Sequence, residues 1–435
     1  SAGKVRICEL SNENCSVLRK LFPFTRPSGH KGRPITIGLG DRLGIASAGH
    51  IRLVKNFEVF PVLAQQSIRE LNLTGRTYED VLSAASWAVF QEGFTTGFGA
   101  DGDHLKTADE VKYALNSGFT MITLDCSEYI DNKVSALPQP DVDALYRSKI
   151  PEDVKKTLES KYVGKDFVLK DGTIIRFSFD DFKRIVLVYL DAVNFAADIF
   201  YNLIKPCGKS IDFEISIDET LTLTSPESHY FAASELTGRG VEAVSVAPRF
   251  YGEFQKGIDY IGDKRLFEKE LRIHVGIADN FGYKISVHSG SDKFSVFPII
   301  GRLTCGRYHL KTAGTNWLEA VRVIAAKNPS LYRKMHKYAV ANLTEAKRYY
   351  HISADVARVP DIDGIPDADL PGLMDMADSR QVLHITYGLI LTAANNNGIP
   401  LFKHEIYSTL NQSEEEYYKS LEKHIGKHLE ALGVG

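Results

Sequence analysis

The stretch Phe213-Glu-Ile-Ser-Ile217 places apolar residues at alternate positions and is followed at once by Asp218-Glu219-Thr220. An alternation with a period of two predicts a β-strand. On that strand Glu214, Ser216 and Asp218 would share one face, because successive side chains point to opposite sides. A carboxylate inside an apolar run is costly unless it is paired or functional. The alternative explanation of Glu214 is a structural salt bridge to a neighbouring strand.

Seven further apolar runs of this kind occur along the chain, and helical segments lie between them. Strands that alternate with helices indicate βαβ units and a parallel sheet. Eight units favour a closed (β/α)8 barrel of the TIM type, and an open doubly wound sheet is the alternative architecture. The eight strand candidates are Pro34–Leu39, Phe60–Leu63, Phe94–Phe98, Phe119–Leu124, Phe213–Ile217, Val244–Val246, Tyr283–Val287 and Tyr308–Leu310.

Helix signals organise the rest of the chain. Thr107-Ala-Asp-Glu110 matches a capping box and predicts a helix to Asn116, which Gly118 ends. Two more helices are expected over Asp292–Gly301 and Asn316–Lys327.

Three segments follow from this pattern. Residues 1–33 are expected to form an α/β preamble and linker, residues 34–327 a catalytic barrel, and residues 328–435 a helical extension packed on it. Residues 141–204 would be an insertion of helices with a hairpin around Lys170–Thr173.

The composition is that of an ordinary globular protein, with 44% hydrophobic residues, 25% charged residues and a formal net charge of -3. The sequence contains no basic block of the kind that binds nucleic acid, so no nucleic-acid partner is expected. No apolar run approaches the roughly 20 residues that span a bilayer, so no membrane partner is expected. The cysteines match no metal or disulfide spacing, which predicts a reduced, cytoplasmic protein. They are Cys8, Cys15, Cys126, Cys207 and Cys305.

Both candidate architectures place the active site at the carboxyl ends of the strands. The pair Asp103-His104 follows the third strand candidate. A neutral imidazole is a ligand for Zn, Mn, Ni or Fe(II), and an adjacent carboxylate can carry protons. The pair therefore predicts a metal-assisted site. The alternative is an Asp that caps a turn beside a surface His.

The same loop formally matches a dinucleotide-binding motif, Gly97-Phe-Gly-Ala-Asp-Gly102. Asp101 and Asp103 would repel a pyrophosphate. The next helix starts only at Thr107, so its free N–H groups are not adjacent to the third glycine. NAD binding is therefore not expected.

Three later strand ends carry further candidates. His288 opens the segment His288-Ser-Gly-Ser-Asp-Lys293, whose small residues and lysine predict an anion site. His309 and Lys311 would point to the same side of the last strand. Arg249 and Glu253 follow the sixth strand candidate, and Glu253 could ligate a metal. The alternative for each is an ordinary polar residue of a loop.

Several long motifs, in order, resemble the tagaturonate epimerase family. The resemblance covers nearly the whole chain beyond the preamble. It is carried by Gly38-Leu-Gly-Asp-Arg-Leu-Gly44, Ala64-Gln-Gln-Ser67, Gly97-Phe-Gly-Ala-Asp-Gly-Asp-His104, Phe213-Glu-Ile-Ser-Ile-Asp-Glu-Thr220, Val287-His-Ser-Gly-Ser-Asp-Lys-Phe-Ser-Val296, His309-Leu-Lys-Thr-Ala-Gly-Thr315 and Tyr350-His-Ile-Ser-Ala-Asp355.

The resemblance implies an epimerase that interconverts D-tagaturonate and D-fructuronate with a divalent metal, and D-tagatose and D-fructose are further candidate substrates. It implies that Asp103 is the proton acceptor and Glu214 the proton donor, and that His104, Glu253 and His288 bind the metal. The metal would be Zn, Mn, Ni, Co or Fe(II). The residues expected to bind substrate are Arg42, Gln66, Asp125, Arg249, Ser289, Lys293, His309 and Lys311.

The Asp-His pair and the later His-Ser-Gly-Ser also resemble class II aldolases, although Glu253 stands where those enzymes carry a third His. The epimerised carbon lies two bonds from the ketone, so its hydrogen is not acidic. A retro-aldol route is therefore expected, with Lys293 and Lys311 holding the substrate carboxylate. The alternatives are transient oxidation by a tightly held NAD, a metal-dependent aldolase and a noncatalytic sugar-binding barrel. A homo-oligomer is left open.

Overall fold

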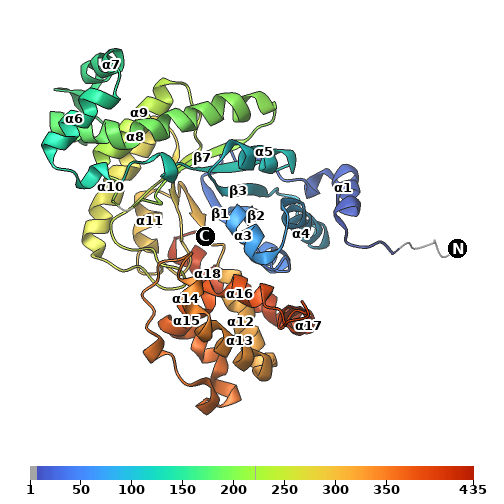
Figure 1. The fold of residues 1–435 in the computed structure, drawn as a ribbon. Coiled ribbons are helices and arrows are strands. Elements are labelled where there is room, and N and C mark those ends of the chain that lie inside the picture. The colour runs from blue at the N-terminus through green and yellow to red at the C-terminus, as the bar shows by residue number, and fades with distance from the viewer. Residues whose placement is uncertain (1–6, 221) are drawn as a thin grey trace.

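The structure is a computed structural model that describes residues 7–220 and 222–435. Eight parallel strands close into a barrel in the order β1-β10-β9-β8-β7-β4-β3-β2 (Figure 1). The predicted (β/α)8 architecture is confirmed, and the open sheet is wrong, because β1 pairs with both β2 and β10. The strands are β1 (Ile35–Gly38), β2 (Phe60–Gln66), β3 (Gly99–Leu105), β4 (Met121–Asp125), β7 (Asp212–Ile217), β8 (Ser245–Pro248), β9 (Lys284–Val287) and β10 (Tyr308–Lys311).

The third strand differs from the prediction. The predicted strand Phe94–Phe98 lies outside β3, which begins at Gly99 in the segment expected to be a loop. Glycine and aspartate are depleted in strands, so their abundance here indicated a loop. Close packing explains the glycines. A Cβ on Gly102 would lie 2.8 Å from the Cβ of Ala114, and one on Gly99 would lie 3.0 Å from Val62.

The barrel helices follow their strands. The capping box at Thr107 is confirmed, because its side chain accepts a hydrogen bond from the N–H of Glu110. The helix expected from Asp292 begins only at Phe297, since residues 292–296 form turns. The helices are α2 (Ser47–Val54), α3 (Ile68–Thr74), α4 (Tyr78–Gln91), α5 (Ala108–Asn116), α8 (Phe179–Ile199), α9 (Pro226–Gly238), α10 (Lys264–Phe281), α11 (Phe297–Leu303) and α12 (Thr315–Lys327).

The insertion after β4 contains the predicted hairpin, formed by β5 (Asp166–Val168) and β6 (Ile174–Arg176). The helices α6 (Gln139–Lys149) and α7 (Glu152–Tyr162) precede it. Residues Phe179–Cys207, which comprise α8, a π-turn and a 3-10 turn, are long and apolar enough to cross a membrane by length and composition. Within their most apolar window 61% of the residues are buried, and α8 packs against α6 and α9. This is the environment of a core helix.

Helical segments precede and follow the barrel. Residues 7–33 contain α1 (Asn12–Leu21) and a 3-10 turn, and the strand expected in the preamble is absent from that described range. After α12, short 3-10 turns occupy the loop-rich stretch between the helices. The helices are α13 (Pro329–Ala341), α14 (Leu343–Ala346), α15 (Ala377–Ile385), α16 (Tyr387–Thr392), α17 (Lys403–Gln412) and α18 (Glu414–Ala431).

The extension packs on the barrel, as the orange and red helices of Figure 1 show. Helix α18 contacts α2 and α12, and α16 contacts α3. Asp292, in the turn after β9, joins the two parts. Its carboxylate accepts hydrogen bonds from Arg380 of α15 at 2.8 Å and from His424 of α18 at 2.6 Å. The extension therefore fixes a loop at the carboxyl end of the barrel.

We predict that Gly301→Ala destabilises the protein. A Cβ on this residue of α11 would overlap the carbonyl oxygen of Leu432, which follows α18. Overpacking of this kind costs about 1–3 kcal/mol, which thermal denaturation would detect as a lower Tm. Gly426→Ala is the matched control. Its Cβ would lie 3.5 Å from the Leu53 side chain, and alanine favours the helix by up to about 1 kcal/mol. Equal Tm values for the two variants would contradict this packing.

Candidate active site

A cavity of about 380 Å³ opens at the carboxyl ends of the barrel strands. Residues that follow the strands form most of its wall, and Tyr350 and His384 of the extension contribute to it. The site therefore lies where the barrel architecture predicts it.

A β-bulge brings Asp103 and His104 to the same side of β3. Consecutive residues of a regular strand point to opposite faces. Here the register to β4 shifts between Gly102 and Leu105, and His104 has a left-handed backbone with φ of 52°. Both side chains consequently line the cavity. Bulges re-aim side chains in this way near active sites, and left-handed backbone at a residue other than glycine is costly.

Lys311, the last residue of β10, lies among three buried carboxylates. Its Nζ is 3.0 Å from Asp101, 2.6 Å from Asp103 and 2.9 Å from Glu214. Burial alone would lower the pKa of Lys311, but these three carboxylates raise it well above its usual value. The lysine is therefore a fixed cation.

The two predicted catalytic carboxylates are held as anions by this cation. Burial would raise the pKa of Asp103, but His104 and Lys311 hold it well below its usual range. Lys311 and the hydrogen bond with His288 act in the same way on the pKa of Glu214. Glu214 also accepts hydrogen bonds from Thr123 and Ser245. Asp103 and Glu214 thus lie on either side of one ammonium group.

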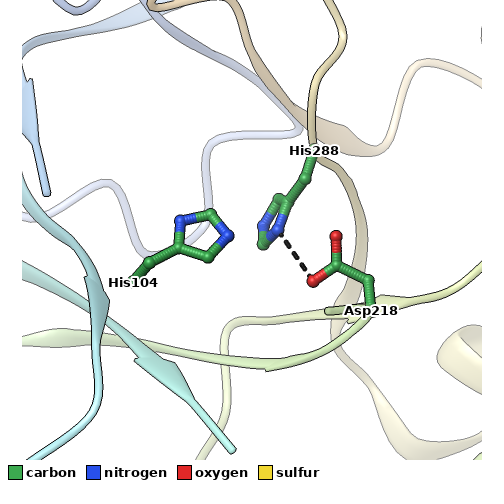
Figure 2. A group of neighbouring side chains, drawn as sticks. All are labelled: His104, Asp218 and His288. Atoms are coloured by element: carbon green, nitrogen blue, oxygen red, sulfur yellow. Dashed lines mark hydrogen bonds and ion pairs between the residues drawn. The ribbon is translucent and has the colours of Figure 1, made fainter. Parts of the chain in front are cut away.

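Beside them, His104, Asp218 and His288 form a group that could hold a metal ion (Figure 2). One ligand atom of each lies within 4.8 Å of the others, and the two imidazole rings are 4.6 Å apart between centroids. Nδ1 of His104 lies 2.8 Å from Asp103. Its Nε2 is 3.9 Å from Glu219, which is beyond hydrogen-bond distance, and within the described part of the chain no other group bonds to this nitrogen, so it can accept a ligand. Two imidazoles and a carboxylate fit a borderline divalent cation.

His288 is held between two carboxylates. Its Nδ1 lies 3.1 Å from Asp218 and its Nε2 lies 2.9 Å from Glu214. Burial would lower the pKa of His288, but Asp218 and Glu214 raise it to about 10. His288 therefore carries a proton on each nitrogen, and a metal cation that binds between these carboxylates can replace one of the protons.

The structure brings most of the predicted residues to this cavity. Glu214 does not line the cavity itself, but it contacts two residues that do, His288 and Lys311. Arg249 donates a hydrogen bond to the carbonyl of Thr220, and Ser289 accepts one from Lys256 at 2.8 Å. The predicted residues that line the cavity are Arg42, Asp103, His104, Arg249, Glu253, His288, Ser289 and Lys311.

Four predicted substrate-binding residues do not line the cavity. Lys293 is buried and donates hydrogen bonds to the carbonyls of Gln255, Ile258 and Ser291, so it braces a loop. Asp125 accepts from the N–H of Ser127, and His309 is bonded to Thr36 inside the barrel. The amide of Gln66 is buried and has no hydrogen-bond partner among the described residues.

Glu253 lines the cavity but is not part of the group formed by His104, Asp218 and His288. It is about half exposed and accepts a hydrogen bond from Gln255. Asp218 is the third member of that candidate group. The strand alternation that places Asp218 on the face of Glu214 was the signal that could have identified it.

A second group of possible ligands, Asp292, His424 and His428, lies apart from this cavity. Its atoms are already engaged. Arg380 pairs with Asp292 at 2.8 Å, and Nε2 of His428 accepts from the N–H of Asp292. This group joins the extension to the barrel.

Comparisons with known proteins agree on one family. The family model for tagaturonate epimerase matches residues 1–432. A tagaturonate/fructuronate epimerase of Thermotoga maritima is 43% identical over 426 residues, which are 98% of this chain and 86% of the relative. A glycerol complex of the fructuronate-tagaturonate epimerase of Cohnella laeviribosi is 53% identical with a TM-score of 0.98, covering 100% of this chain and 88% of that one. Its native crystal structure has the same TM-score at 52% identity.

We predict that Lys311→Met destabilises the protein mainly at neutral pH. Asp103 and Glu214 have pKa values below those of the unfolded chain, so their contribution to stability is present at neutral pH and is lost on acidification. Without Lys311 the carboxylates repel one another and their pKa values rise, so the stability of the variant increases as the pH falls. Urea denaturation should show a loss of about 3–5 kcal/mol at pH near 7, and a smaller loss near pH 4.5.

The double variant Lys311→Met/Asp101→Asn is the control for this prediction. It removes one of the three carboxylates and should recover part of the lost stability at neutral pH. A loss that is the same at both pH values, with no recovery in the double variant, would contradict the ionised cluster.

Proposed function

This chain belongs to the tagaturonate epimerase family, and on that premise we propose that it is an isomerase that interconverts D-tagaturonate and D-fructuronate. The observation that carries the proposal is the pairing of Asp103 and Glu214 across Lys311, beside His104, Asp218 and His288. Two ionised carboxylates next to a candidate metal group suit proton transfer at a sugar carbon and its hydroxyl.

The chemistry of the substrate favours a retro-aldol route. The two uronates differ at a hydroxyl-bearing carbon two bonds from the ketone, so the hydrogen on that carbon is not activated. Asp103, whose pKa is held well below its usual range, is a weak base for such a hydrogen. A hydroxyl proton becomes more acidic as the adjacent C–C bond breaks, and a weak base can then accept it.

Each of the two carboxylates has a separate part in this proposal. Asp103 accepts the proton of the target hydroxyl and returns it after the aldehyde half has turned. Glu214 handles the proton on the opposite side, through its contacts with Lys311 and His288. Lys311 keeps both carboxylates ionised before the substrate binds. After the aldehyde half has turned, the C–C bond can re-form at either face of the aldehyde carbon, which gives either epimer.

We propose that His104, Asp218 and His288 hold the divalent cation, in place of the set with Glu253. When bound, such a cation supplies Lewis-acid stabilisation of negative charge on neighbouring oxygens. The nitrogen and carboxylate ligands suit Zn, Mn, Ni, Co and Fe(II) alike. D-Tagatose and D-fructose remain candidate substrates, and a cytoplasmic location remains a prediction from the reduced cysteines.

We predict that Asp103→Asn and Glu214→Gln each lower kcat for tagaturonate by about 10²- to 10⁴-fold, the usual contribution of general acid–base catalysis. Proton NMR of the product mixture would measure the rate. Asp125→Asn is the matched control, because Asp125 is also buried at the end of the neighbouring strand, but its carboxylate is paired with Ser127 and Lys106 instead of Lys311. Near-normal kcat in Asp103→Asn would remove this residue from the mechanism.

We predict that metal binding releases a proton and strengthens as the pH rises from 6 to 9. His288, with a pKa of about 10, carries a proton that a metal must displace. Calorimetric titration of the chelator-treated protein in two buffers of different ionisation enthalpy would detect the released proton. Asp218→Asn should weaken the affinity by at least about 10-fold. His424→Gln, in the second group, should leave the metal-binding stoichiometry unchanged. If this variant no longer bound metal, the assignment of the metal to His104, Asp218 and His288 would be wrong.

A further inference from the structure

One end of the cavity is strongly basic. Arg42, Arg69 and Lys256 all line it, and they come from three loops or helix starts that follow β1, β2 and β8. Arg42 is 2% exposed and pairs with Glu70 at 3.0 Å. Its Nη1 and the Nε of Arg69 are buried and have no hydrogen-bond partner within residues 7–220 and 222–435. The two guanidinium groups are therefore not fully satisfied by partners within the described residues.

The three cations are close enough to repel one another. Burial lowers the pKa of Lys256, and the neighbouring Arg69 and Arg42 lower it further. Glu70 is the buried anion in contact with Arg42, and the nearby Glu219 is 39% exposed. Three cations with one buried counter-ion leave a positive end to the cavity, which an anionic ligand would stabilise.

The arrangement is rigid. The guanidinium of Arg42 stacks 3.8 Å above the Tyr387 ring, and that of Arg69 lies 4.8 Å above Tyr350. Nζ of Lys256 donates to Ser289 at 2.8 Å. Both tyrosines belong to the extension, so the extension orients the two arginines. Preorganised donors of this kind bind a carboxylate without a large loss of side-chain entropy.

We infer that Arg42, Arg69 and Lys256 form the subsite for the carboxylate of the sugar acid, at the end of the substrate remote from the ketone. This inference rests on the proposed function. It replaces the expectation that Lys293 and Lys311 hold that carboxylate, because both are committed to partners inside the protein. Ser289, which Lys256 contacts, directly follows His288, so this subsite adjoins the candidate metal group.

The subsite has a second consequence in the retro-aldol route. The C–C bond on the ketone side of the target carbon breaks, its electron pair stays with the ketone half, and the hydroxyl proton of the target carbon goes to Asp103. After reprotonation the halves are dihydroxyacetone and tartronate semialdehyde, which together contain all the atoms and the charge of the hexuronate. The aldehyde half carries the carboxylate. An anchored carboxylate therefore lets the aldehyde turn about a single bond without leaving.

The test uses Lys256→Met and Arg69→Met in the full chain loaded with metal. Lys106→Met is the matched control, since it removes a positive charge from the loop after β3 and does not line the cavity. Three quantities are measured: kcat/KM for tagaturonate and for tagatose, release of dihydroxyacetone by a coupled reductase, and calorimetric binding of the unreactive pair D-galactonate and galactitol.

We expect kcat/KM for tagaturonate and affinity for galactonate to fall on the order of 10- to 100-fold in both variants. The values for tagatose and galactitol should change less than about 3-fold. The two variants should release more dihydroxyacetone during turnover than the wild type, because their aldehyde half is no longer anchored. Equal losses for acid and neutral ligands, or no loss for either, would overturn the subsite. If wild-type protein binds galactonate through Lys256 but does not epimerise tagaturonate, the proposed function fails while the subsite stands.

Discussion

The ammonium group of Lys311 is the interaction on which the site depends. Asp101 and Asp103 of β3 and Glu214 of β7 converge on it from the barrel interior. Three buried carboxylates without a cation would take up protons, because an uncompensated buried charge is costly. Lys311 holds the pKa values of Asp103 and Glu214 well below their usual range, so these two stay ionised. A buried ion cluster adds little stability compared with an apolar core, so its presence at the carboxyl end of a barrel indicates a chemical role.

The rest of the architecture positions groups around this cluster. The bulge in β3 turns His104 to the same side as Asp103, and β9 is followed directly by His288, which bridges Glu214 and Asp218. The extension acts at the basic part of the cavity, where its tyrosines hold the arginines. Asp292 ties the loop after His288 to α15 and α18. One cavity thus combines the carboxylates and the candidate metal group with a basic cluster of two arginines and a lysine.

Much of this was accessible from the sequence. The period of the apolar runs predicted eight barrel strands, and seven of them overlap the observed ones. The third predicted strand was misplaced, because glycines in a sequence usually indicate a loop. Only the structure shows that neighbouring side chains pack closely against the glycines of β3. Asp103, His104, His288 and Lys311 follow from their positions at strand ends, and Glu214 from its position inside an apolar strand. Arg69 and Lys256 do not, since a surface cation and a site cation look alike in sequence. Lys293 shows the reverse difficulty, because only the fold reveals its three carbonyl partners.

In the proposed reaction the ionised carboxylates act on hydroxyl protons while a C–C bond breaks, and not on a hydrogen bound to carbon. The most direct measurement is epimerisation of tagaturonate in D2O, with the product examined by proton NMR. The epimerised carbon should keep its original hydrogen. Deuterium at that carbon in the first-formed fructuronate would show that the C–H proton is removed, and the retro-aldol route would then be wrong.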